Sequence, residues 1–143
     1  MVSIDEPPPQ VIPPTEPPPQ VIVDNGDTDA SSTGTWKVSG GPNPYDDNSL
    51  YSQDGDATHA FEAYADGFYE VSMWWTYHST RCTSVPIEIY DGDTWLDTVE
   101  VNQKSNGGQW NVLGTYAFNG TARIVIISEG NCTTCADAVK FAQ

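Results

Sequence analysis

Strict alternation of apolar and polar side chains is the feature that most restricts the fold of this chain. The clearest case is FYEVSMWWTY, which occupies residues 68–77. Side chains along a strand point alternately to opposite faces, so this segment predicts one buried face and one outward face. The face expected in the core carries Tyr69, Val71, Met73, Trp75 and Tyr77, and the outward face carries Phe68, Glu70, Ser72, Trp74 and Thr76.

The same period of two recurs along the chain, with turn residues between the repeats. DNGD at 24–27, DGD at 91–93, NGG at 106–108 and NG at 119–120 supply the positive φ that tight hairpins require. No amphipathic segment of helical length is present. We therefore predict an all-β, antiparallel β-sandwich, with strands at Val21–Asp24, Thr35–Ser39, Ala57–Ala65, Phe68–Tyr77, Val85–Tyr90, Trp95–Asn102, Trp110–Phe118, Ala122–Ser128 and Ala136–Phe141.

The first twenty residues have a different composition. They hold eight of the eleven prolines, and the heptapeptide EPPPQVI occurs twice, at 6–12 and 16–22. Each proline fixes φ and lacks an amide donor, so this stretch favours extended polyproline II over a helix or a central strand. The sequence predicts a Pro-rich polyproline II arm over residues 1–20 and one β-sandwich domain over residues 21–143.

The chain is strongly acidic, because 20 Asp and Glu against five Lys and Arg give a formal charge of −15. This charge disfavours nucleic acid and anionic membranes as partners. No apolar run approaches the roughly 20 residues that span a bilayer, so membrane insertion is not expected. Abundant Asp, Asn, Thr, Gly and aromatic residues with few lysines indicate an exported protein, either secreted or at the cell surface.

Six segments together resemble a known domain family: VDNGD, TGTW, GFYEVSMWW, RCTSVPIEIYDG, VNQKSNGGQWNVLGTYAF and ADAVKF. From about Val23 to Phe141 the chain is similar to the golvesin C-terminal, or xanthan-lyase-associated, β-sandwich domain. The resemblance implies a jelly-roll-like, non-catalytic module attached to secreted bacterial enzymes and surface proteins, with a carbohydrate-binding role and polysaccharide as its partner. It implies the fold more strongly than the ligand, because one fold serves many functions.

The residues themselves give little support to catalysis. His59 and His78 are the two histidines, and the sequence has no Gly-x-Ser-x-Gly, no metal-binding histidine pair and no phosphate-binding loop. A carboxylate pair for glycoside hydrolysis could be present among the many acidic residues, but most of these occupy turns. We therefore expect a binding module and not an enzyme.

Three cysteines, Cys82, Cys132 and Cys135, allow three pairings that each leave one thiol over. A Cys82–Cys132 disulfide closes a long loop and is favoured by chain entropy, with Cys135 free or intermolecular. Cys135 is the alternative partner, although a Cys132–Cys135 bond closes almost nothing. The CTTC spacing is weak evidence for zinc without a second pair or a histidine.

Sugar binding requires an aromatic platform and fixed polar groups around it. The candidate platforms are Trp74, Tyr77 and Trp95. The candidate polar groups are Arg81, Asn102, Gln103 and Gln109. In the alternative interpretation Trp95 and Trp110 close the ends of the sandwich and the amides bond to their own loop backbone.

Two further expectations concern the ends of the domain. Asp24, Asp27 and Asp137 would meet if the terminal strands pair, and carboxylates from several loops suit a structural calcium ion. The repeated apolar pairs of the arm, Val11, Ile12, Val21 and Ile22, are candidate docking segments for neighbouring subunits. The alternative function is therefore a structural subunit of an extracellular fibre that polymerises through its arm.

Overall fold

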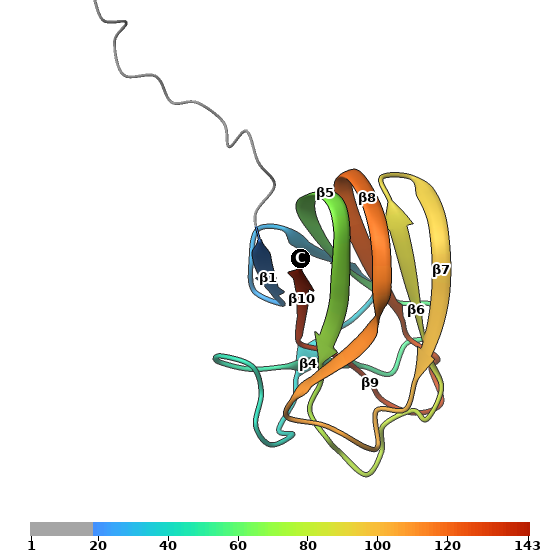
Figure 1. The fold of residues 1–143 in the computed structure, drawn as a ribbon. Coiled ribbons are helices and arrows are strands. Elements are labelled where there is room, and N and C mark those ends of the chain that lie inside the picture. Colours follow the sequence, from blue (N-terminus) through green and yellow to red (C-terminus); the bar gives the residue numbers. More distant parts are fainter. Residues whose placement is uncertain (1–18) are drawn as a thin grey trace, which may run out of the picture.

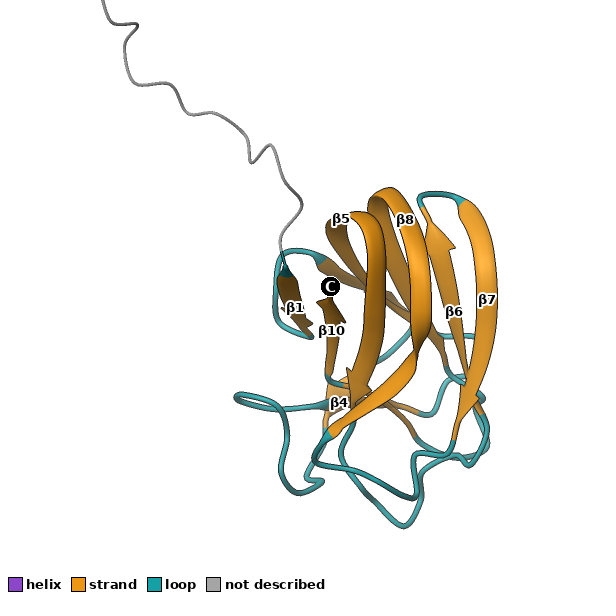
Figure 2. Cartoon of the chain, in the orientation of Figure 1, coloured by secondary structure: helices purple, strands orange, loops and turns teal. Residues whose placement is uncertain are grey.

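The computed structural model describes residues 19–143, and within that range the secondary structure is all strand and loop (Figure 2). No helix in this part of the chain is long and apolar enough to cross a bilayer. The strands are β1 (Gln20–Asp24), β2 (Ala30–Thr33), β3 (Lys37–Val38), β4 (Leu50–Ser52), β5 (Thr58–Trp74), β6 (Val85–Asp91), β7 (Thr94–Val101), β8 (Trp110–Ile127), β9 (Thr134–Ala136) and β10 (Ala138–Ala142). The predicted antiparallel β-sandwich is confirmed.

Two long strands, β5 and β8, pair along their whole length and form the centre of the sandwich. Both bend sharply at one end of the molecule, so that the two halves of each strand lie in different layers (Figure 1). The bend falls where Ala65 pairs with Gly120 and Gly67 pairs with Phe118. Gly67 and Gly120 have φ values of 115° and 123°. Residues that carry a Cβ rarely adopt this backbone conformation. The prediction of separate strands on either side of each glycine is wrong.

All the strands together form two sheets. The main sheet has the order β1-β10-β5-β8-β6-β7, with β2 also paired to β5, and a small sheet contains β3, β4 and β9. β2 and β4 were not predicted, because three or four residues are too short to show an alternation. The strand expected at 35–39 is reduced to Lys37–Val38, and the strand expected at 136–141 is two strands separated by Asp137.

The hydrophobic core lies on the inner face of the bent sheet. Four of the five residues expected there are buried: Tyr69, Val71, Met73 and Trp75. Tyr77 is 46% exposed, because β5 ends at Trp74 and the alternation does not continue into the following loop. Aromatic rings pack between strands inside this core. The ring centroids of Phe118 in β8 and Phe141 in β10 are 6.1 Å apart.

The second EPPPQVI copy turns out to contribute to the domain itself. Val21 and Ile22 lie in β1 and pair with Phe141 and Lys140 of β10 in the same chain. Val21 and Ile22 therefore belong to an intradomain strand, and their role as docking segments for neighbouring subunits stays a prediction. Val11 and Ile12 lie outside the described residues, as does most of the arm, so the polyproline II and docking predictions for that part remain predictions.

A buried histidine at the start of β5 leads to a first testable expectation. His59 is 2% exposed, its ring lies 4.9 Å from that of Phe61, and its Nδ1 has no hydrogen-bond partner. Burial lowers the pKa of His59 from its ordinary 6.5 to about 4. Below about pH 6.5 the unfolded chain therefore binds a proton that the folded chain accepts only near pH 4.

We expect this difference to reduce the free energy of unfolding by about 3 kcal/mol as the pH falls from 6.5 to 4. Urea titrations at several pH values would measure the slope, with a His59→Leu variant as the comparison. The variant should lose this part of the pH dependence whatever its absolute stability. Parallel slopes for the two proteins would contradict the assignment.

Candidate functional site

The loops at the end of the sandwich opposite the bend form one connected surface. The segment after β5 lies against the segment between β7 and β8, because the Gly108 N–H donates to the Trp75 carbonyl at 2.8 Å and the Gln103 N–H donates to the Cys82 carbonyl at 3.0 Å. Gly107 makes the closest approach: a Cβ there would lie 2.7 Å from the Tyr77 nitrogen. These contacts place several of the predicted ligand-binding residues on neighbouring loops.

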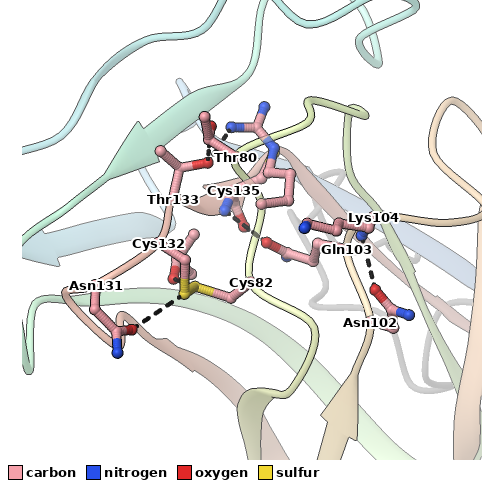
Figure 3. Close-up of a disulfide and its surroundings, with 11 residues drawn as sticks. Thr80, Cys82, Asn102, Gln103, Lys104, Asn131, Cys132, Thr133 and Cys135 are labelled. Atoms are coloured by element: carbon pink, nitrogen blue, oxygen red, sulfur yellow. Dashed lines mark hydrogen bonds between the residues drawn. A yellow bond between two sulfur atoms is a disulfide. The ribbon is translucent and has the colours of Figure 1, made fainter.

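A disulfide between Cys82 and Cys132 links two of the segments that form this surface (Figure 3). The pairing is the one that the loop-closure argument favours. Cys135 is free and fully buried, and burial raises the pKa of its thiol. In this structure its thiol lies in the interior, away from the surface at which an intermolecular disulfide would form.

Arg81 is a buried cation directly beside this disulfide. Its Nε donates to the Thr76 carbonyl at 2.9 Å, and its terminal nitrogens donate to hydroxyl groups of Ser39, Thr76 and Thr133 at 2.8–3.1 Å. Arg123 and Glu62 form the single ion pair found among residues 19–143, so Arg81 has no carboxylate partner within that range. Neutral acceptors hold the guanidinium in place, and its positive charge is left uncompensated.

A surface depression lies over Arg81, and we call it the loop-end hollow. It consists of two adjoining concavities of about 330 and 690 Å³ that share Gln53, Thr80, Arg81 and Thr133. Tyr51 of β4 and His78 line one side. Lys104 and Asn131 line the other. A hollow of this size suits a small ligand or one or two sugar units.

Sequence reasoning missed most of this lining. Tyr51, Gln53, His78, Thr80 and Asn131 were not predicted as site residues, and neither Tyr51 nor Gln53 belongs to a recognisable motif. They reach the hollow through the pairing of β4 with β9, where Tyr51 lies opposite Cys135. A three-residue strand gives no signal from which that pairing could be deduced.

The predicted polar groups have mainly structural roles. Gln103 is buried and binds both the N–H and the carbonyl of Cys135, at 2.7 and 3.0 Å. The Asn102 side chain accepts a hydrogen bond from the backbone of Lys104 (Figure 3). Gln109 is exposed in the same loop and lines neither part of the hollow. Of these four polar residues Arg81 alone lines the hollow, and hydrogen bonds within the protein hold its side chain in place.

The predicted aromatic platforms are not brought together. Trp95 is exposed, but it follows the Gly92–Asp93 turn of the β6–β7 hairpin. Figure 1 shows this turn at the end of the sandwich opposite the long loops. Trp74 packs edge-on against Tyr45 and Trp110, and its Nε1 donates to the Asn43 carbonyl at 2.9 Å. A loop therefore partly covers Trp74, and the tilted rings of this cluster do not form one flat platform.

The three predicted calcium ligands lie around the junction of β1 and β10. Asp24 ends β1 opposite Ala138, and the N–H of Asn25 donates to the Asp137 carbonyl at 2.8 Å. Asp27 is in the turn that follows, where its carboxylate accepts the Asp24 N–H at 2.8 Å. The terminal strands therefore pair as that prediction assumed.

Comparison with known proteins identifies the family of the chain. The family profile described as the Golvesin C-terminal domain matches residues 21–143. The chain belongs to this family. Its sequence is 32% identical to the xanthan lyase of Bacillus sp. (strain GL1) over a match that covers 84% of this chain and 14% of the lyase. The chain thus spans about one seventh of the length of that relative.

Solved structures extend the comparison to the fold. A xanthan lyase from Paenibacillus superimposes with a TM-score of 0.79 at 34% identity, covering 87% of this chain and 13% of the lyase. A family 35 carbohydrate-binding module from an environmental isolate gives 0.62 at 12% identity, covering 86% and 93%. A CBM36-1 domain of a xylanase from the hindgut metagenome of Trinervitermes trinervoides gives 0.60 at 12% identity, covering 87% and 97%. At such identities the last two likenesses concern the fold.

Proposed function

We propose that the chain is a non-catalytic carbohydrate-binding module that acts outside the cell and holds a segment of polysaccharide in the loop-end hollow. Family membership and the shared fold of carbohydrate-binding modules support the ligand class. The disulfide supports an oxidising compartment, since such bonds persist mainly in exported proteins. The observation that carries the proposal is the hollow itself, with its aromatic wall and its polar rim.

The lining of the hollow offers the two kinds of contact that sugar rings need. Tyr51 is half-buried and presents an aromatic side chain on one wall, where an apolar sugar face could pack. Gln53, Thr80 and Asn131 offer amide and hydroxyl groups that can bond to sugar hydroxyls. The residues that line the hollow include the cations Arg81 and Lys104 and no Asp or Glu, which favours glycans that carry carboxylates.

Affinity electrophoresis tests the proposal. Native gels that contain xanthan, a neutral glucan, a mannan or a xylan should retard the protein in at least one case. Tyr51→Ala should weaken the retarding interaction about tenfold, which corresponds to about 1.4 kcal/mol, within the range of one aromatic contact. Lys104→Gln should weaken binding to an anionic polysaccharide and leave binding to a neutral one unchanged.

Trp95→Ala is the matched control, because Trp95 is an exposed aromatic residue away from the hollow. Its retardation should equal that of the unmodified protein. Trp74→Ala tests the cluster of Tyr45, Trp74 and Trp110 as an alternative binding surface. A loss of retardation confined to this variant would place the ligand on that cluster. Absence of retardation by every polysaccharide in the panel would remove the proposed function.

A further inference from the structure

A group of carboxylates surrounds the junction of β1 and β10. Asp24 and Asp137 come from the two paired strand ends, and one loop is fastened across them. The Tyr45 N–H donates to Asp137 Oδ2 at 2.9 Å, and the Asn25 side chain donates to the Asn48 carbonyl at 2.8 Å. These two bonds hold both ends of the segment 45–48, which carries Asp46 and Asp47, beside the junction.

Two oxygens in this group lack a partner. Asp137 is 0% exposed and Asp24 is half-buried, yet Oδ1 of each is a buried atom without a hydrogen bond. Nearly all buried polar atoms in proteins are satisfied, and a carboxylate oxygen is especially costly to leave unpaired. Two such atoms at one strand junction indicate a group that binds them both.

The charges around the junction have one sign. The turn with Asp27 and the segment with Asp46 and Asp47 are both hydrogen-bonded to the residues of this junction. Among residues 19–143 the single ion pair joins Arg123 to Glu62, so none of these carboxylates has a cationic partner in that range. This group of carboxylates therefore lacks a positive charge to balance it.

We propose that the junction binds a calcium ion, with Oδ1 of Asp24 and Oδ1 of Asp137 as its central ligands. Calcium prefers hard oxygen ligands and accepts irregular coordination geometry, whereas magnesium demands a near-ideal octahedron. The segment 45–48 and water supply further oxygens. Zinc is disfavoured because the group holds neither thiolate nor imidazole.

A second group of potential ligands can be set aside. Cys82, Glu129 and Cys132 have ligand atoms within 4.8 Å of one another. Both of these sulfurs are bonded in the disulfide, however, so they are not available to a metal. The two unpaired carboxylate oxygens at the junction of β1 and β10 therefore remain as the candidate ligands.

The calcium ion would join three parts of the chain that are distant in sequence. It links the end of the first strand, the segment 45–48 and the beginning of the last strand, and so fixes the end of β1 at Asp24. This role does not depend on carbohydrate binding, because the loop-end hollow has none of these residues in its lining.

The test uses the full chain after treatment with a chelator. Isothermal titration with calcium chloride should show one ion bound per chain, with saturation by about 1 mM free calcium. A hundredfold excess over Kd should raise the thermal midpoint by roughly 5–15 °C. Asp137→Asn and Asp24→Asn should each weaken calcium binding at least tenfold. Asp93→Asn, an exposed turn residue outside the group, should bind as the unmodified chain does.

Three results would overturn the inference: no uptake at about 1 mM free calcium, unchanged uptake in both Asp24→Asn and Asp137→Asn, or an equal effect of magnesium at the same concentration. If Asp137→Asn does not fold, Asp24→Asn decides the question alone, because Asp24 is only half-buried and its replacement disturbs less of the core.

Discussion

Replacing Cys82 and Cys132 together by alanine is expected to lower the free energy of unfolding by about 4 kcal/mol. The two cysteines are 50 residues apart, and the chain-entropy relation for a loop of that length gives this value. Single domains have a stability of only about 5–15 kcal/mol, so the change would remove a large part of the total. Urea unfolding of the oxidised protein and of the double variant measures the difference.

Reducing the disulfide of the unmodified protein should reproduce most of this loss. Asn131→Ala is a suitable control, because Asn131 is exposed beside Cys132 and its replacement should change stability by less than about 0.5 kcal/mol. A loss below about 1 kcal/mol in the double variant would contradict the prediction.

The same bond matters for the proposed binding surface. Cys132 lines the loop-end hollow between Asn131 and Thr133, and Thr133 accepts a hydrogen bond from Arg81. Without the disulfide, the segment that carries Asn131 keeps only non-covalent contacts, such as the bond from the Thr133 N–H to the Thr80 carbonyl and the pairing of Thr134 with Ser52. Weaker retention on polysaccharide gels should therefore accompany the lower stability of the double variant.

The fold was predictable because alternation and turn chemistry are local signals. The Asp91–Asp93 turn is a hairpin as expected, with Gly92 at φ 60°. Asn119–Gly120 gives the same local signal, yet it bends one continuous strand and does not separate two. Whether a glycine with positive φ ends a strand or bends it depends on the partner strand, here at Gly67, and one segment of sequence does not contain that information.

The site was less predictable because it consists of loops that only tertiary contacts bring together. Arg81 could be chosen from sequence as a cation in a polar loop, but its burial under Ser39, Thr76 and Thr133 depends on three separate segments. Gln103 was also chosen from sequence as a binding residue, but its side chain forms hydrogen bonds with the buried backbone of Cys135. The Asp24 and Asp137 pair was foreseeable because strand pairing of the termini is a simple topological expectation.

Phe61→Ala is expected to reduce the free energy of unfolding by about 3–5 kcal/mol, whereas Phe68→Ala on the same strand should change it by less than about 0.5 kcal/mol. Both residues belong to β5, but Phe61 is 0% exposed and Phe68 is 72% exposed. Removing the Phe61 ring leaves a cavity next to His59 and opposite Ala30 and Ile124. Removing the Phe68 ring leaves only solvent.

The two variants form a matched pair, because they delete the same atoms from one strand, on either side of its bend. Thermal and urea unfolding under one set of conditions gives both values. Comparable losses for Phe61→Ala and Phe68→Ala would mean that the outward face of β5 is covered in solution and that the inner face is not the sole core. A large difference between them would show that one alternation, carried without interruption through Gly67, determines which side of the bent strand encloses the core.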